Sequence, residues 1–319
     1  MCLTHVLIGL PLALLTLCAA AETPTTPNSD AAKNLDALVS SAVRRTQEKF
    51  ATENLKDDDV AVTLIDVRDA ARPRSGRFRG DAPVYPASVV KLFYLAATHQ
   101  WLEDRRLGDS DELRRTLRDM IVDSSNDATG AIVDALSGVG NGAPLPDDEM
   151  KAWAEKRQVV NRYFVSLGYT GINVCQKAYA EGPYGRERIF LGPKFENRNK
   201  LTTDATARLL SEIALGKAVS PDRSRQMMEL LKRDPAKKGD GPDDQATGFS
   251  AGALPAGSRL WSKAGWTSTA RHDAAYVETP AGQKFVLVIF TTGHARKREI
   301  LPAIAGAAIE ALRGGATGE

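Results

Sequence analysis

The sequence predicts an α+β fold, in which an antiparallel sheet formed from N- and C-terminal segments is flanked by helices and carries an inserted all-helical lobe. Two observations support this prediction. Runs of β-branched and apolar residues, typical of strands, lie at 60–67 and again between 260 and 292. The long stretch between these runs mostly shows apolar residues at helical spacing. One sheet therefore has to be completed by distant parts of the chain.

The first residues resemble a secretory signal peptide. An apolar run from Val6 to Leu17 precedes small residues, and we place the cleavage after Ala21. The run is too short for a membrane span, and its leading segment lacks Lys and Arg. A lipoprotein anchored through Cys18 is an alternative that the sequence leaves open. We expect a periplasmic or secreted protein without a membrane span.

Residues 1–21 are thus a predicted signal peptide, 22–34 a flexible leader and 35–315 one folded domain. A helix is expected first in this domain, at 35–50, and then the first strand, which ends in a hairpin turn or loop at 72–81. The remaining expected elements are helical patterns at 89–136 and 149–167, an irregular stretch at 173–199, helices at 203–215 and 221–232, strands at 260–263, 272–278 and 283–292, and a last helix at 296–313.

Composition excludes several classes of partner. The formal net charge is only +2, and no basic cluster suggests nucleic acid binding. After signal removal Cys175 is the only cysteine, so no intrachain disulfide can form. The four histidines are scattered without metal-binding spacing. We therefore expect no metal and no organic cofactor.

The segment 85–95 predicts a tight turn that runs into an apolar helix, with Ser88 in the first turn. Lys91 follows three residues later, on the same face, so its amine can reach the serine hydroxyl. Apolar neighbours lower the pKa of a lysine, and a neutral amine can activate a serine nucleophile. Backbone N–H groups at the helix start can hold an oxyanion. Taken alone, the pattern also fits a serine N-cap and a solvated lysine.

Two further stretches follow in order, Asp123-Ser124-Ser125-Asn126 and Lys263-Ala264-Gly265-Trp266. With Ser88 and Lys91 they resemble the S-x-x-K, S-D-N and K-T-G motifs of penicillin-recognising serine hydrolases, most closely the class A serine β-lactamases. The resemblance covers most of the mature chain and implies the β-lactamase/DD-peptidase fold, with a serine hydrolase domain over 35–315. Supporting matches lie at 198–203, 253–257 and 288–293.

The resemblance implies roles for four catalytic residues. Ser88 would be the acyl-forming nucleophile, and Lys91 would be its proton partner. Ser124 would protonate the leaving nitrogen, with electrostatic support from Lys263.

The same resemblance implies a set of substrate-binding residues. Asn126 would bind the amide of the substrate side chain, and the N–H of Trp266 would complete the oxyanion hole with that of Ser88. Gly265 would leave room for the substrate along the strand. Arg271 would face the substrate carboxylate, although a solvated arginine at a strand edge fits its position equally well.

The chain also departs from the family pattern. Ser125 replaces an aspartate, and Ala264 replaces the threonine that helps to hold the carboxylate, a loss for which Thr267 or Ser268 could compensate. The E-x-x-x-N loop that supplies the deacylating glutamate is missing. Glu181 is the nearest candidate for this general base, and a solvated loop carboxylate is the alternative reading of it.

These features predict a monomeric enzyme, a secreted class A-like β-lactamase that hydrolyses the β-lactam amide through an acyl-enzyme on Ser88 and so gives antibiotic resistance. A D-alanyl-D-alanine peptidase or penicillin-binding protein with slow deacylation is the first alternative. A catalytically silent peptidoglycan-binding module is the second. The expected partner is accordingly a small β-lactam or a peptidoglycan stem peptide.

Overall fold

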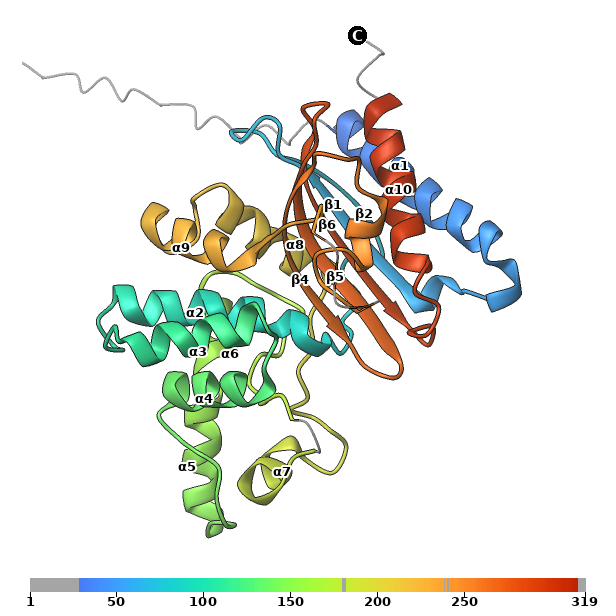
Figure 1. Cartoon of the computed structure of the whole chain (residues 1–319). Helices are drawn as coiled ribbons and strands as arrows, with labels where there is room; N and C mark the ends of the chain where they lie inside the picture. Colours follow the sequence, from blue (N-terminus) through green and yellow to red (C-terminus); the bar gives the residue numbers. More distant parts are fainter. Residues whose placement is uncertain (1–28, 180–181, 238, 240, 242, 315–319) are drawn as a thin grey trace, which may run out of the picture.

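A six-stranded antiparallel sheet forms the centre of the molecule in the computed structural model, which describes residues 29–179, 182–237, 239, 241 and 243–314 (Figure 1). The strand order is β2-β1-β6-β5-β4-β3. This architecture confirms the predicted fold class. The strands are β1 (Val60–Asp66), β2 (Arg74–Phe78), β3 (Lys232–Arg233), β4 (Arg259–Trp266), β5 (Ala270–Glu278) and β6 (Lys284–Thr292).

The N- and C-terminal segments meet in the middle of this sheet. β1 pairs with β6 in antiparallel register, with Thr63 opposite Val288. Along β6, Phe285, Leu287 and Ile289 pack into one apolar core, and the residues between them pack into a second core on the other face. Since both faces are covered, the strand is apolar at nearly every position instead of alternating with polar residues.

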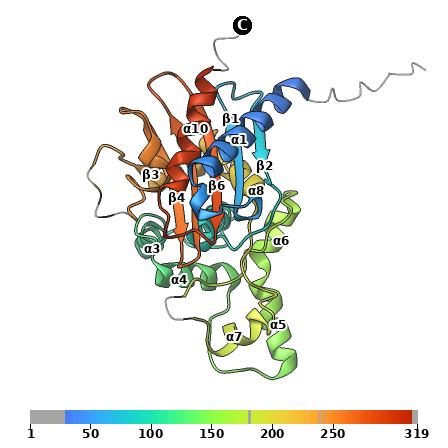
Figure 2. The same ribbon diagram turned by 90° about the vertical axis from the view of Figure 1, so that its right-hand side faces the viewer.

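The first of these cores lies beneath the helices α1 (Ser29–Lys49) and α10 (Ile300–Gly314), which run side by side on one face of the sheet (Figures 1 and 2). α1 begins at Ser29, six residues before the start at residue 35 that the sequence predicts for this helix. The predicted signal peptide and Cys18 lie outside the described residues.

The other face carries α8, which packs against β1 and β6, and the lobe of helices that extends from it (Figure 1). α2 is the central helix of this lobe, because nearly all its side chains are buried and it contacts α3, α4, α6, α8 and α9. The helices on this face are α2 (Lys91–Glu103), α3 (Asp111–Ile121), α4 (Asn126–Ser137), α5 (Asp147–Arg157), α6 (Val159–Ser166), α7 (Gly185–Leu191), α8 (Thr203–Ala214) and α9 (Pro221–Leu231).

Three elements differ from the sequence prediction. β2 lies in the segment that was expected to be a loop, because backbone pairing with β1 and contact with α1 stabilise a strand whose own residues are mostly polar. α7 is a helix of seven residues inside the stretch expected to be irregular. β3 consists of two residues at the edge of β4. In the described part of the chain, no helix has the length and apolar character needed to cross a membrane.

Candidate active site

Ser88 lies in the 3-10 turn η3 (Ala87–Val90), which continues directly into α2. The turn is held by β5. The Nδ1 atom of His272 accepts a hydrogen bond from the Thr291 N–H at 3.1 Å, so its Nε2 atom carries the proton and donates to the Tyr85 carbonyl at 2.9 Å. His272 is fully buried, and this burial lowers its pKa to about 4. The neutral ring therefore ties the segment before Ser88 to the sheet.

Backbone geometry around the serine is unusual in two places. Ala87, which precedes Ser88, has a φ of 47°, and Ser124 has a φ of 56°. Both values lie in the left-handed region, which residues other than glycine seldom occupy and which occurs often at functional sites. The surrounding packing must therefore hold both residues in place.

Gly265 allows β4 to approach the Ser88 turn closely. A Cβ atom at this position would lie 2.7 Å from the Ser88 nitrogen and 2.8 Å from the Val89 nitrogen. The sequence argument assigned this space to a substrate, whereas in the structure the backbone of η3 occupies it. Gly265 therefore acts by placing the Ser88 N–H against the end of β4.

The Trp266 N–H points to the outer edge of β4, beside that turn. The N–H of the next residue, Thr267, points toward β5 and donates to the Ala270 carbonyl at 2.8 Å. Alternate N–H groups of an antiparallel strand point to opposite sides, so that of Trp266 points outward. The outward N–H of Ala264, which donates to Gln245, follows the same alternation. The arrangement is suited to an oxyanion hole formed with the Ser88 N–H.

Lys91 is completely buried one turn after Ser88. Its Nζ atom donates to the Ser124 carbonyl at 2.5 Å, to the Ser124 hydroxyl at 3.1 Å and to the Asn126 side-chain oxygen at 3.0 Å. Burial lowers the pKa of Lys91 to about 7. Near neutral pH a substantial fraction of this amine is therefore unprotonated and able to accept a proton.

Lys263 reaches the same hydroxyl from β4. Its Nζ atom donates to the Ser124 Oγ atom at 3.0 Å, so this oxygen joins the two lysines. Burial, together with the nearby cations Lys91 and Arg233, holds the pKa of Lys263 well below its usual value. The Ser124 hydroxyl thus brings Lys91 and Lys263 together, and Ser88 lies one turn before Lys91.

Asn126 connects this group to the loop that follows α6. Its Nδ2 atom donates to the Tyr179 carbonyl at 3.2 Å. The neighbouring Ser125 caps α4, because its hydroxyl accepts a hydrogen bond from the Ala128 N–H at 3.1 Å. The serine that replaces the family's aspartate therefore has a local structural role.

Arg271 is turned to internal partners. Its guanidinium is buried, bonds to Asp243 at 2.7 Å and lies 3.8 Å above the ring of Phe249. Phe249 in turn packs against Trp266. Because Arg271 is only 2% exposed, the alternative reading of it as a solvated strand-edge residue is wrong. A substrate carboxylate at Arg271 would have to compete with the Asp243 carboxylate.

Gln245 is a site residue that the sequence did not indicate. Its Oε1 atom accepts hydrogen bonds from the Lys263 ammonium at 2.7 Å and from the Ala264 N–H at 3.1 Å. It belongs to a polar segment without motif or periodicity. The Thr267 hydroxyl accepts the N–H groups of Thr269 and Ala270 in the turn after β4.

Within the described residues, no carboxylate lies within hydrogen-bond distance of either lysine. Glu181, the candidate general base, lies outside the described residues. Two hollows flank the centre. One, of about 710 Å³, includes Asn126 and Tyr179, and the other, of about 570 Å³, includes Gln245 and Trp266.

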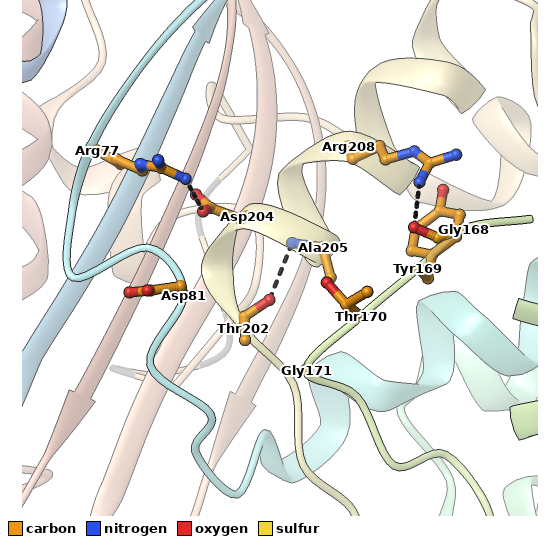
Figure 3. A pocket seen from close by; sticks show the side chains of 10 residues that line it. All are labelled: Arg77, Asp81, Gly168, Tyr169, Thr170, Gly171, Thr202, Asp204, Ala205 and Arg208. Carbon is orange, nitrogen blue, oxygen red and sulfur yellow. Dashed lines mark hydrogen bonds and ion pairs between the residues drawn. The ribbon is translucent and has the colours of Figure 1, made fainter. Parts of the chain in front are cut away.

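A third hollow, of about 260 Å³, lies away from these groups, between β2, α8 and the loop at 168–171 (Figure 3). Two of its charged side chains are engaged with protein atoms: Arg77 pairs with Asp204 at 2.8 Å, and Arg208 donates to the Gly168 carbonyl at 3.2 Å. Asp81 also lines the hollow. Because both guanidinium groups already bond to protein atoms, we assign the hollow no ligand.

Comparison with known proteins gives consistent results. Residues 102–313 match a family model described as the β-lactamase enzyme family. The match begins after Ser88 and Lys91, so the assignment of the nucleophile rests on the motif and the geometry. A search of curated protein sequences finds no match.

Solved structures resemble the chain at low sequence identity. A β-lactamase from Sphaerobacter thermophilus is 18% identical, with a TM-score of 0.62 over 86% of this chain and 97% of that one. A β-lactamase from Chitinophaga pinensis is also 18% identical, with a TM-score of 0.61 over 85% and 99%. A point mutant of PBP-A, determined as an acyl-enzyme complex with penicillin G, is 17% identical, with a TM-score of 0.61 over 88% and 97%. These similarities show a shared fold.

Proposed function

The chain belongs to the β-lactamase enzyme family, and on that premise we propose that it is a serine hydrolase that opens β-lactams through a covalent acyl-enzyme on Ser88. The observation that carries the proposal is that the Ser124 hydroxyl is hydrogen-bonded to both buried lysines. One of these lysines, Lys91, lies one turn after the proposed nucleophile, Ser88. Such an assembly suits proton transfer and favours an active enzyme over a silent binding module.

Acylation would proceed by attack of the Ser88 oxygen on the lactam carbonyl carbon. The neutral amine of Lys91 takes the serine proton as the new C–O bond forms. The proton then passes through the Ser124 hydroxyl to the ring nitrogen as the C–N bond breaks. The N–H groups of Ser88 and Trp266 stabilise the oxyanion, an effect worth about 3–4 kcal/mol per donor in such sites.

Deacylation requires water to attack the new ester. Among the described residues Lys91 has only neutral oxygen partners, and Glu181, the candidate general base, lies outside them. Loss of about 4 kcal/mol of assistance slows a step by about a thousandfold. We therefore propose acylation that is much faster than deacylation.

This contrast also favours a second candidate, a penicillin-binding D-alanyl-D-alanine peptidase of the same fold. In that case the natural substrate is a peptidoglycan stem peptide, and a β-lactam becomes a long-lived adduct. The point mutant of PBP-A, one of the structurally similar proteins, was determined as an acyl-enzyme complex with penicillin G. For either candidate we propose export by the N-terminal signal pattern and action as a monomer.

The experiment is electrospray mass spectrometry of the mature protein mixed with a chromogenic cephalosporin, followed over time together with colour. We expect a single covalent adduct that is absent in Ser88→Ala and present in Ser220→Ala, which removes a helix-capping serine elsewhere. Steady colour with a transient adduct indicates a β-lactamase, and one burst with a persistent adduct indicates the peptidase. An unmodified wild type, or an adduct retained in Ser88→Ala, contradicts the proposal.

A further inference from the structure

Two hydrogen-bond donors converge on one point at the edge of β4. The Lys263 ammonium and the Ala264 N–H both donate to the Oε1 atom of Gln245, at 2.7 and 3.1 Å. A buried ammonium beside a backbone N–H suits an anionic oxygen, because hydrogen bonds between charged groups are stronger than those to neutral acceptors. The oxygen that occupies the point belongs to a neutral amide.

The point lies where a substrate of the proposed reaction has to bind. Lys263 also bonds the Ser124 hydroxyl, so the Gln245 oxygen is one side chain away from the proposed proton path. The Trp266 N–H points to the same edge of β4. A substrate held by this N–H would therefore extend past Gln245.

The Gln245 side chain is held by three described hydrogen bonds, none of them to its own segment. Apart from the two bonds to its oxygen, its amide nitrogen makes one described hydrogen bond, to the Val122 carbonyl at 3.1 Å. The side chain is half-buried and belongs to a segment without helix or strand. Its neighbour Asp243 anchors this segment through ion pairs with Arg271 and Arg298. The anchor and the amide are thus separate, so the amide can rotate while the segment stays in place.

We propose that Gln245 determines specificity by occupying, with its amide oxygen, the position where the carboxylate of a substrate binds, so that the substrate has to displace it. The proposal rests on the proposed function for the identity of the substrate. It makes Gln245 a competitor of an anionic ligand. A residue that only positioned Lys263 would affect charged and uncharged ligands alike.

The test compares benzylpenicillin with its uncharged methyl ester, using the acylation rate constant of each. In Gln245→Ala the preference for the free acid over the ester should rise about tenfold, which corresponds to freeing one charge-assisted hydrogen bond. In Gln245→Glu the preference should fall by at least tenfold, since a fixed carboxylate repels the ligand. Gln226→Ala, which removes an exposed amide on α9, is the matched control and should change neither rate. Thermal unfolding midpoints check that each variant folds.

Equal loss of rate for acid and ester in Gln245→Ala would overturn the proposal and make Gln245 a positioning residue. The same comparison in a Ser88→Ala background, with equilibrium binding measured by calorimetry, needs no acylation. In this background, Gln245→Ala should increase the affinity for the free acid more than the affinity for the ester. If that increase is found but no variant that retains Ser88 is acylated, the proposed function is refuted and the role of Gln245 is supported. Acylation without a change in the acid-to-ester preference would refute the role of Gln245 and keep the function.

Discussion

Helix α4 carries a buried charged cluster at each end, and the two clusters are built in opposite ways. At its first turn, Asn126 contacts Lys91, which shares the Ser124 hydroxyl with Lys263, so two cations lie together without a carboxylate in contact among the described residues. At its last turns, Asp134 lies with Arg157, Lys177 and Glu187, two carboxylates with two cations.

The second cluster has the features of a structural ion pair. The Arg157 side chain is fully buried, bonds Asp134 at 3.0 Å and the Ser137 hydroxyl at 2.9 Å, and pairs with Glu187. Arg157 lies on α5 and pairs with Glu187 on α7 and with Asp134 on α4. These pairs hold α7, and the start of the loop that leads to α8, against α4 and α5. Burial raises the pKa of Glu187, and the Arg157 guanidinium opposes this rise.

The lysine cluster lacks such compensation. Desolvation without a counter-charge favours the neutral amines and makes the protonated state destabilising. Asp273 attracts Lys263 from β5, but the cations Lys91 and Arg233 act against it. The paired cluster holds a loop in place, whereas we expect the lysine cluster to reduce stability and to keep a proton acceptor available.

The largest expected effect on stability comes from opening the paired cluster. Arg157→Met should lower the free energy of unfolding by about 3–5 kcal/mol, because Glu187 is left buried without a partner. Urea denaturation measures the change. The matched control is Arg225→Met, which breaks the exposed pair with Asp222 and should lower it by less than about 1 kcal/mol. Equal losses in the two variants would contradict the structural role of the cluster.

A smaller change of opposite sign is expected for the unpaired cluster. Lys91→Met keeps the length of the side chain and removes the buried charge, so the free energy of unfolding at pH 7 should rise by about 1–3 kcal/mol. Acylation of Ser88 should fall by about a thousandfold, because the proton acceptor is lost. Lys151→Met, at an exposed site on α5, should change neither by a measurable amount. A destabilised Lys91→Met protein would show that this lysine stabilises the fold.

Much of the fold could be predicted because the apolar pattern is strong where the packing is strong. β1 and β6 are apolar at nearly every position, and the Ser220-Pro221 pair marks the start of α9, where the Ser220 hydroxyl caps the helix. β2 and α7 could not be predicted, because tertiary contacts stabilise them. Residues 74–78 read as a polar loop until β1 pairs with them.

The candidate site divides in the same way. Ser88, Lys91, Ser124 and Lys263 belong to motifs of fixed spacing, so the sequence indicated them, and in the structure the Ser124 hydroxyl joins the two lysines. Gln245 and His272 act through single side chains from distant segments, for which the sequence holds no pattern.

Arg271 illustrates a second limit of the sequence analysis. Its position on β5 was expected, but the capture of its guanidinium by Asp243 depends on the path of a loop. Local sequence patterns do not determine such a path.

Neither active-site lysine is bonded to a carboxylate in the described part of the chain, and their burial should make stability depend on pH. Their folded pKa values lie below the unfolded value of 10.5, with that of Lys91 at about 7. The unfolded chain therefore binds more protons between pH 7 and 10.5, and stability should rise with pH in this window.

The measurement is the difference in free energy of unfolding between the wild type and the double variant Lys91→Met, Lys263→Met from pH 6 to 10. We predict that the free energy of unfolding of the wild type increases relative to that of the variant as pH rises above 7. The increase should be up to about 1.4 kcal/mol per pH unit for each lysine. A difference that stays constant over this range would show that both lysines keep ordinary pKa values, and would contradict the account.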